Sequence, residues 1–179
     1  NGTKELGCLW KYDINKSTWS LLNNSILWKK SCHKMLYYKE NLIIIGGYID
    51  KKFETYSNIT HTTQIKFFCT KNNYWRTEEF KCQSERLKYF IESVFDFQAN
   101  IIDNIIYVFG ENYSFNSKSN NYIKKIGLVR IDLDKRNIDE IYNENNTLEY
   151  LVQMKNRSAH LMVYNTNDQK LYISGGKSE

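Results

Sequence analysis

The feature that most constrains this chain is a short apolar run that ends in glycine and occurs three times. The three copies read Leu42-Ile43-Ile44-Ile45-Gly46-Gly47, Ile106-Tyr107-Val108-Phe109-Gly110 and Leu171-Tyr172-Ile173-Ser174-Gly175-Gly176. Their last glycines are separated by 63 and 66 residues. A regular period of this kind is typical of repeat architectures, in which a single unit is too small to fold alone. The sequence therefore predicts an array of similar, strand-rich units.

A second motif follows the glycine runs in a fixed order. A polar turn closed by a large apolar residue begins 22 residues after Gly47 and again 22 residues after Gly110, and an earlier copy lies near the start of the chain. The three turns are residues 13–19 (DINKSTW), 69–75 (CTKNNYW) and 132–138 (DLDKRNI). A centre rich in Asn, Asp and Lys between two apolar strands is typical of a β-hairpin.

These two motifs together resemble the kelch repeat, which is the four-stranded blade of a β-propeller. The last copy is the most similar, since Arg157-Ser158-Ala159-His160 precedes its glycine run as the Arg and His of that family commonly do. Phe109 replaces the first glycine in the middle copy, Ile138 stands where Trp is expected, and the period exceeds the roughly 50 residues usual for kelch. The resemblance implies an all-β fold, namely a partial kelch-like propeller of four-stranded antiparallel blades.

With the strands of a blade named a to d from the centre outward, the chain is expected to hold half a blade, two whole blades and another half. These pieces are residues 1–26, 27–81, 82–142 and 157–179 of a single propeller domain spanning 1–179. The expected strands are c 5–12 and d 18–22; a 33–38, b 41–45, c 63–68 and d 74–80; a 93–99, b 105–109, c 126–131 and d 138–142; a 159–164 and b 170–174.

Three blade equivalents are too few for a ring, because propellers close with 4 to 8 blades. We therefore expect the remaining blades to come from the same or another chain, so that the sequence is a fragment of a larger protein or assembly. In particular, the first half blade is expected to receive its missing strands a and b from elsewhere, since unpaired edges invite aggregation.

Aromatic residues at the expected strand positions are predicted to form the core between blades. Trp19 and Trp75 begin the outer strands, where a large flat side chain can fill the wedge between sheets. The same core position is expected for the other aromatic residues of the strands: Tyr12, Phe67, Phe68, Tyr107 and Tyr172.

No arrangement of residues in the sequence predicts an active site. The repeat places His33 and His160 at equivalent positions near the start of strand a, which indicates structural histidines that bond backbone groups, and His61 lies in a loop. Some kelch-like propellers are copper oxidases, but such chemistry needs His, Tyr and Cys ligands that converge on one metal. We therefore expect a non-catalytic protein without metal or cofactor.

Long loops suggest protein binding as the function. Residues 48–62 and 111–124 would join strands b and c, and residues 81–92 and 143–157 would lead to the next blade. Connections longer than about 12 residues are usually functional or disordered, and aromatic and Arg side chains are the usual anchors of interfaces. The sequence thus predicts a protein–protein interaction scaffold whose partner-binding residues are Tyr48, Tyr56, Arg86, Tyr113 and Phe115.

Composition favours a cytoplasmic protein but leaves an alternative. The net charge of +5 is mild and the basic residues are scattered, so we expect no nucleic-acid partner, and no apolar stretch is long enough to span a membrane. Cys8, Cys32, Cys69 and Cys82 show no metal-binding spacing and are expected to be reduced. The alternative is a secreted or surface propeller that recognises glycans or acts on carbohydrate, suggested by glycosylation sequons at Asn1, Asn15, Asn23, Asn58, Asn112, Asn145 and Asn156.

Overall fold

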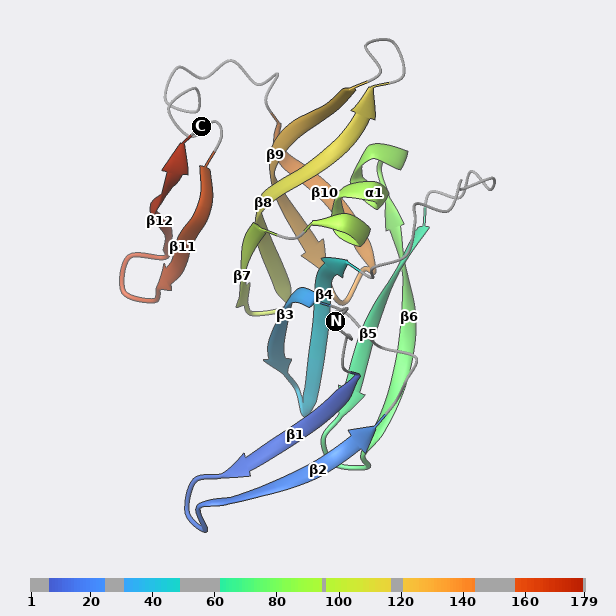
Figure 1. The fold of residues 1–179 in the computed structure, drawn as a ribbon, viewed down its shortest axis with the longest axis vertical. Helices are drawn as coiled ribbons and strands as arrows, with labels where there is room; N and C mark the ends of the chain where they lie inside the picture. Colours follow the sequence, from blue (N-terminus) through green and yellow to red (C-terminus); the bar gives the residue numbers. More distant parts are fainter. Residues whose placement is uncertain are drawn as a thin grey trace, which may run out of the picture.

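The computed structural model describes residues 7–24, 31–48, 62–94, 96–116, 121–143 and 157–178, which form an all-β fold with one helix (Figure 1). Every strand expected from the sequence is present in this part of the chain, which confirms the all-β prediction. The elements are β1 (Cys8–Asp13), β2 (Thr18–Asn24), β3 (Ser31–Tyr38), β4 (Asn41–Tyr48), β5 (Thr62–Cys69), β6 (Tyr74–Cys82), α1 (Glu85–Ser93), β7 (Asp96–Ile102), β8 (Ile105–Asn116), β9 (Asn121–Asp132), β10 (Asn137–Asn143), β11 (Arg157–Asn165) and β12 (Lys170–Ser178).

The strands form one large sheet and two hairpins. The large sheet has the order β3-β4-β5-β6-β10-β9-β8-β7, whereas β1–β2 and β11–β12 each form a two-stranded sheet. We call β3–β6 the first unit and β7–β10 the second unit. Strands within each unit are antiparallel, and the units are joined by a parallel pairing of only two residue pairs, Asn137 with Lys81 and Ile138 with Cys82.

The large sheet curls until its edge strands β3 and β7 approach each other, so that it is nearly closed and resembles a barrel (Figure 1). The sequence predicts separate four-stranded blades, and the strand order inside each unit agrees with that prediction. The continuous sheet does not, because β6 and β10 connect the two units. Separate propeller blades are therefore not confirmed.

The hydrophobic core lies between the two units. Alternate residues of a strand point to the same face of its sheet. We call the face of a unit that carries the residue opposite the repeated glycine its front face, and the other its back face. The front face of the second unit packs on the back face of the first. The buried residues in this core are Ile43, Ile45, Ile65, Phe67 and Phe80 from the first unit and Phe97, Ile106, Val108, Val129, Ile131 and Ile138 from the second.

The repeat seen in the sequence is reproduced in strand register. The first glycine of each run faces an equivalent residue of the preceding strand: Gly46 faces His33, Gly110 faces Phe97, and Gly175 faces His160. The structure thereby aligns Gly46, rather than Gly47, with Gly110. The polar turns are also alike, because the fifth residue of each turn has a left-handed φ angle: Ser17 (φ 50), Asn73 (φ 55) and Arg136 (φ 52).

Helix α1 was not expected, since the sequence suggested a loop over residues 81–92. Ser84 caps the helix, and its hydroxyl oxygen accepts a hydrogen bond from the backbone N–H of Leu87 at 3.3 Å. Four apolar residues at helical spacing, Leu87, Phe90, Ile91 and Val94, are buried in the core between the units. The Ser84 cap and the helical spacing of the apolar residues indicate a helix in the sequence, but the assignment of this segment from the strand repeat overlooked them.

The prediction of an aromatic core is confirmed in part. Phe67 and Phe68 are buried, and Trp75 and Tyr107 are partly buried. Three residues were predicted wrongly, because Tyr12, Trp19 and Tyr172 are exposed. All three lie in the two hairpins, where the described residues supply no further strands to cover them.

The expected loops are largely replaced or lie outside the described residues. Most of the 111–124 segment is strand, because β8 and β9 continue as a long hairpin to Asn116 and Asn121. Most of residues 48–62 and 143–157 lie outside the described part of the chain. Among the described helical residues, no helix is long and apolar enough to cross a membrane.

Candidate interaction surfaces

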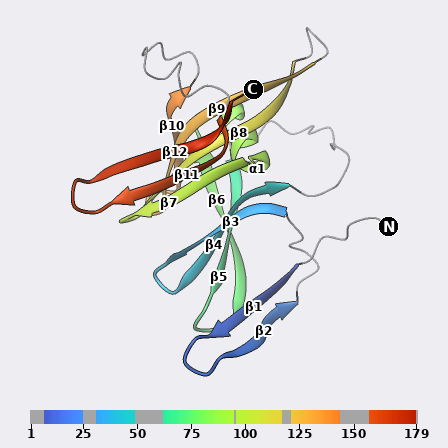
Figure 2. The same ribbon diagram turned by 60° about the vertical axis from the view of Figure 1, so that its left-hand side comes forward.

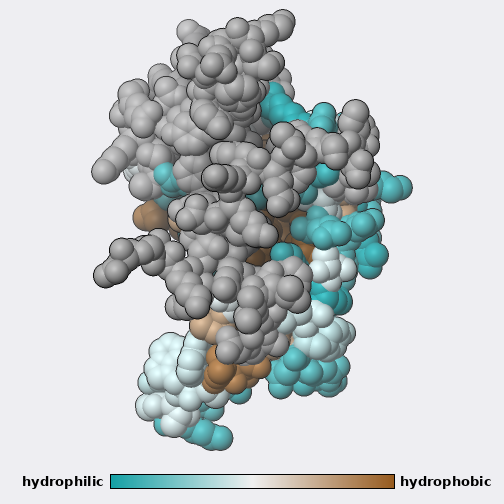
Figure 3. Space-filling view, turned by 45° about the vertical axis from the view of Figure 1, so that its right-hand side comes forward, coloured by the Kyte–Doolittle hydropathy of each residue, from teal (hydrophilic) through white to brown (hydrophobic). Residues whose placement is uncertain are grey.

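The β1–β2 hairpin carries an exposed aromatic face. Its strands pair Tyr12 with Trp19 and Trp10 with Leu21, so these four side chains share one side of the hairpin. We call this set the aromatic face. Trp19 is 68% exposed, the other three are also exposed, and the rings of Tyr12 and Trp19 lie 4.9 Å apart. Figure 3 shows pale and brown surface at the lower end of the molecule, where the hairpin lies.

The positions equivalent to Tyr12 and Trp19 in both complete units are buried or partly buried. The turn register makes Phe68–Trp75 and Ile131–Ile138 the counterparts of Tyr12–Trp19. Phe68, Ile131 and Ile138 are fully buried. In those units, strand b pairs with strand c and places Leu42 beside Phe68 and Ile106 beside Ile131. Strand β1 has no such neighbour among the described residues, and the aromatic face is therefore exposed.

The front face of the β11–β12 hairpin packs on the back face of the second unit. The carbonyl oxygens of His160 and Met162 accept hydrogen bonds, both 2.8 Å long, from the side-chain amides of Gln98 and Asn100 in β7. Phe109 and Met162 are buried in this contact, together with the partly buried residues Leu128, Leu171 and Ile173. Figure 2 shows the hairpin alongside β7 and β8.

His160 anchors that contact. Its side chain is 1% exposed, and its Nε2 lies 3.1 Å from the carbonyl oxygen of Phe109. Because a carbonyl oxygen can only accept, Nε2 must be the protonated nitrogen in this bond. The histidine therefore has the structural, backbone-bonding role that the sequence predicts. His33, its equivalent in β3, is exposed.

Two further apolar surfaces face outward. The back face of the β11–β12 hairpin exposes Leu161, Val163 and Tyr172, and the front face of the first unit exposes Met35 and Tyr37 in β3. Contiguous exposed apolar patches commonly mark sites of protein interaction.

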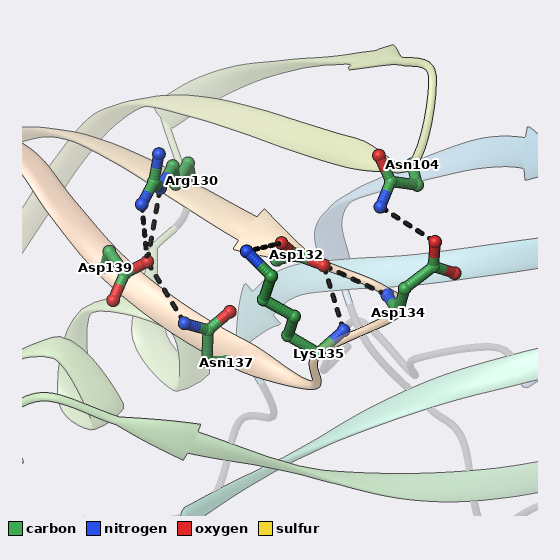
Figure 4. A network of polar contacts seen from close by, with 7 residues as sticks. All are labelled: Asn104, Arg130, Asp132, Asp134, Lys135, Asn137 and Asp139. Carbon is green, nitrogen blue, oxygen red and sulfur yellow. Dashed lines mark hydrogen bonds and ion pairs between the residues drawn. The ribbon is translucent and has the colours of Figure 1, made fainter.

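A polar network holds the β9–β10 turn and its hairpin together (Figure 4). Asp132 Oδ1 accepts hydrogen bonds from the backbone N–H groups of Asp134 at 3.1 Å and Lys135 at 2.9 Å. These bonds, chiefly the one from Lys135, lower the pKa of Asp132. On the same hairpin, Arg130 Nη2 lies 3.1 Å from Asp139 Oδ2. Each carboxylate thus has a partner that explains its position.

The predicted partner-binding residues are not brought into one described site. Arg86 lies in α1, and its Nη2 is 3.4 Å from Glu140 Oε1 in β10, so it links the helix to the sheet. Tyr48 ends β4, while Tyr113 and Phe115 lie in β8 rather than in a loop. Tyr56 lies outside the described residues. The binding role of these five residues stays a prediction, and the aromatic face was missed because Tyr12 and Trp19 were assigned to the core.

Chemically reactive groups are sparse in the described part of the chain. It holds no group of three or more His, Cys, Asp and Glu residues that could bind a metal ion. Cys8, Cys32, Cys69 and Cys82 are free cysteines. Burial raises the pKa of the Cys82 thiol to about 11, which keeps it protonated and unreactive near neutral pH.

No protein-family model matches the chain, and no curated protein matches it. The kelch resemblance thus rests on the sequence motifs alone.

Proposed function

We propose that this chain is a non-catalytic protein–protein interaction scaffold and forms part of a kelch-like propeller. The observation that carries the proposal is the aromatic face, which is exposed on β1–β2 although the counterparts of Tyr12 and Trp19 in two repeats are buried or partly buried. Exposing two Trp residues and one Tyr on one side of a hairpin is costly in water, and large aromatic residues dominate the energetics of protein interfaces.

The stacking of the units supports the propeller part of the proposal. The second unit packs front to back on the first, and the β11–β12 hairpin packs front to back on the second unit. A stack that repeats one relationship between successive sheets is the arrangement that a radial array requires. A cytoplasmic location belongs to the same proposal, and the four free cysteines support it, since disulfides are rare in that compartment.

Substituting both tryptophans of the aromatic face tests the proposal. The bait is Trp10→Ser/Trp19→Ser, and partners are captured by chemical cross-linking from cells that express the tagged chain. Tyr74→Ser is the matched control, because Tyr74 is a similarly exposed aromatic residue at the start of β6. We expect the double variant to lose specific partners that the wild type and the control retain. Equal recovery with all three baits, at unchanged thermal stability, would contradict the proposal.

A second candidate function is carbohydrate recognition. Trp10 and Trp19 lie on the same exposed face and offer flat apolar surfaces, and Asn15 of a glycosylation sequon is exposed in the adjoining turn. Titration with oligosaccharides, followed by tryptophan fluorescence, tests it. A saturable change that disappears in Trp19→Ser would favour this candidate, whereas a spectrum that no oligosaccharide alters would count against it.

A further inference from the structure

The two hairpins are complementary halves of one four-stranded unit. β11–β12 corresponds to strands a and b, because His160 faces Gly175 as Phe97 faces Gly110. β1–β2 corresponds to strands c and d, because Asp13 pairs with Thr18 as Asp132 pairs with Asn137. The described residues contain no strand beside the outer edge of either β12 or β1.

The complete units fix the register in which β12 and β1 would pair. The residue five positions before the first glycine of the run pairs with the first residue of the polar turn: Asn41 with Cys69 and Ile105 with Asp132. The same rule applied to the hairpins gives four pairs in an antiparallel ladder. They are Lys170 with Asp13, Leu171 with Tyr12, Tyr172 with Lys11, and Ile173 with Trp10.

Side-chain chemistry in this register is complementary. Lys170 and Asp13 have opposite charges, and opposite charges directly across a ladder are favourable. Tyr172 faces Lys11, just as Tyr107 faces Arg130 in the second unit. Leu171 faces Tyr12, which repeats the apolar pairs Leu42–Phe68 and Ile106–Ile131. A ladder displaced by one residue would separate the charges and place Lys170 beside Tyr12.

The pairing would also cover the exposed apolar surfaces. In this register the aromatic face continues the front face of β11–β12, which already packs on the back face of the second unit. The aromatic face would then lie over β9 and β10. The back face of β11–β12 would be covered by the same front-to-back rule. It would meet the front face of the first unit that follows the paired β1–β2 along its chain, so that Leu161, Val163 and Tyr172 would contact Met35 and Tyr37.

The two hairpins of one chain lie apart in both views (Figures 1 and 2). If they paired within one chain they would close a ring of three units, fewer than the 4 to 8 found in propellers. Two copies joined through both pairs of hairpins reach that range. Another copy of this chain therefore offers edges that fit both hairpins.

We propose that two copies of this chain associate through their hairpins, with β12 of one copy pairing with β1 of the other in the register Lys170–Asp13 to Ile173–Trp10. This inference rests on the proposed function, and it names a second copy as a partner of the scaffold. His33 of the second copy would then occupy the place that His160 holds on the second unit. Its imidazole would approach the carbonyl oxygen of Ser174, which is the counterpart of Phe109.

Disulfide trapping between separately purified variants tests the pairing and its register. Lys11→Cys is mixed with Tyr172→Cys and oxidised, and peptide mapping locates the cross-link. Lys11→Cys mixed with Ser174→Cys is the matched control, because position 174 lies on the same face but two residues out of register. We expect a covalent dimer between positions 11 and 172, formed at least tenfold faster than in the control.

Three outcomes would overturn this proposal. They are the absence of the 11–172 cross-link, equal rates in both mixtures, and a Lys11→Cys/Tyr172→Cys double variant that cross-links within single chains in dilute solution. A failure of this kind leaves the scaffold proposal standing if the aromatic face still captures other proteins. If the chain neither captures other proteins through the aromatic face nor associates with itself, both the scaffold proposal and the pairing of two copies are wrong.

A charge exchange provides a measurement that does not depend on cysteine chemistry. Wild-type protein is expected to show twice the 21.4 kDa mass of one chain by light scattering. Lys170→Glu should weaken self-association by up to about 30-fold, since a cross-strand charge pair contributes up to about 1 kcal/mol and the variant removes one from each of the two hairpin contacts. Mixing Lys170→Glu with Asp13→Lys should restore both hairpin contacts, because one then has the native charge pair and the other has the same pair with its charges exchanged. A wild-type mass of one chain at every concentration tested would contradict the proposal.

Discussion

The imidazole of His160 lies against Phe109, with a ring centroid distance of 4.9 Å and a hydrogen bond from Nε2 to the Phe109 carbonyl oxygen. These residues are 51 positions apart and belong to different sheets, so the bond fixes the β11–β12 hairpin on the second unit.

Replacing His160 should therefore loosen that hairpin. In His160→Ala the carbonyl oxygen of Phe109 loses its partner, and we expect a cost of about 1–3 kcal/mol. Hydrogen exchange followed by mass spectrometry should show lower protection in β11 and β12. His33→Ala is the control at the equivalent, exposed position and should leave β11 protection unchanged. Wild-type protection in His160→Ala would show that the anchor lies elsewhere.

Gly110 should tolerate no side chain. A Cβ atom at this position would lie 2.1 Å from Phe97 Cβ and 2.9 Å from the carbonyl oxygen of Asp96, so both strands would have to move. We expect Gly110→Ala to lower the free energy of unfolding in urea by about 3 kcal/mol or more. At Gly175 a Cβ meets nothing within 4 Å, and only the φ of +71 opposes it. Gly175→Ala should therefore cost about 1 kcal/mol.

The strand repeat was the part of the fold that the sequence predicted well. Its period and its two motifs located every described strand because apolar runs, glycine stops and polar turns act locally. The joining of the two units through β6 and β10 was not predictable in this way, since it is a short contact of two residue pairs, with hydrogen bonds from Lys81 and Gln83 to the carbonyl oxygens of Arg136 and Ile138. It depends on how far the whole sheet curls.

The candidate site was predicted poorly for a related reason. Trp19 and Trp75 have the same place in the repeat, and the sequence alone gives them the same environment. What separates them is the neighbouring strand: β4 lies beside β5 in the first unit, whereas among the described residues the outer edge of β1 has no neighbouring strand. Exposure of the aromatic face is thus a property of the assembly, and no local pattern encodes it.

The polar turns make a prediction about backbone conformation. Asn73 has a φ of 55°, in the left-handed region where Asn and Gly are favoured. Asn73→Ala should destabilise the protein by about 1 kcal/mol in urea unfolding, because a Cβ without a compensating side-chain bond is strained there. Asn73→Gly is the matched variant and should change stability by less than half as much. Equal losses for both variants would indicate that the Asn side chain, rather than the backbone angle, matters.

Acid stability should depend on Asp132. Backbone N–H donors hold the folded-state pKa of this carboxyl below its ordinary value of 3.8. Its contribution is therefore complete above the unfolded-state pKa of about 3.9 and is lost as the pH falls through the lower folded-state pKa. Asp132→Asn should be less stable than wild type at pH 6, and the difference should shrink towards pH 2. Asp103→Asn, which changes an exposed carboxylate in another turn, is the control. A difference that is constant with pH would contradict this assignment.

The cysteines should differ sharply in reactivity. Cys82 is buried and its thiol pKa is raised to about 11, whereas Cys32 is exposed. In folded protein at pH 7.5, a thiol reagent should label Cys32 within minutes and Cys82 only after denaturation. Mass spectrometry of the labelled peptides distinguishes the two. Rapid labelling of Cys82 without denaturant would mean that the core between the units opens readily.

Helix α1 limits where recognition can occur on this molecule. Small eight-stranded barrels often keep a small molecule in their interior, but here Leu87, Phe90 and Ile91 fill the space that such a guest would need. A binding partner would then have to contact the rim or the outer faces of the sheets. Substitutions at those positions would leave the helix-packed centre between the units in place.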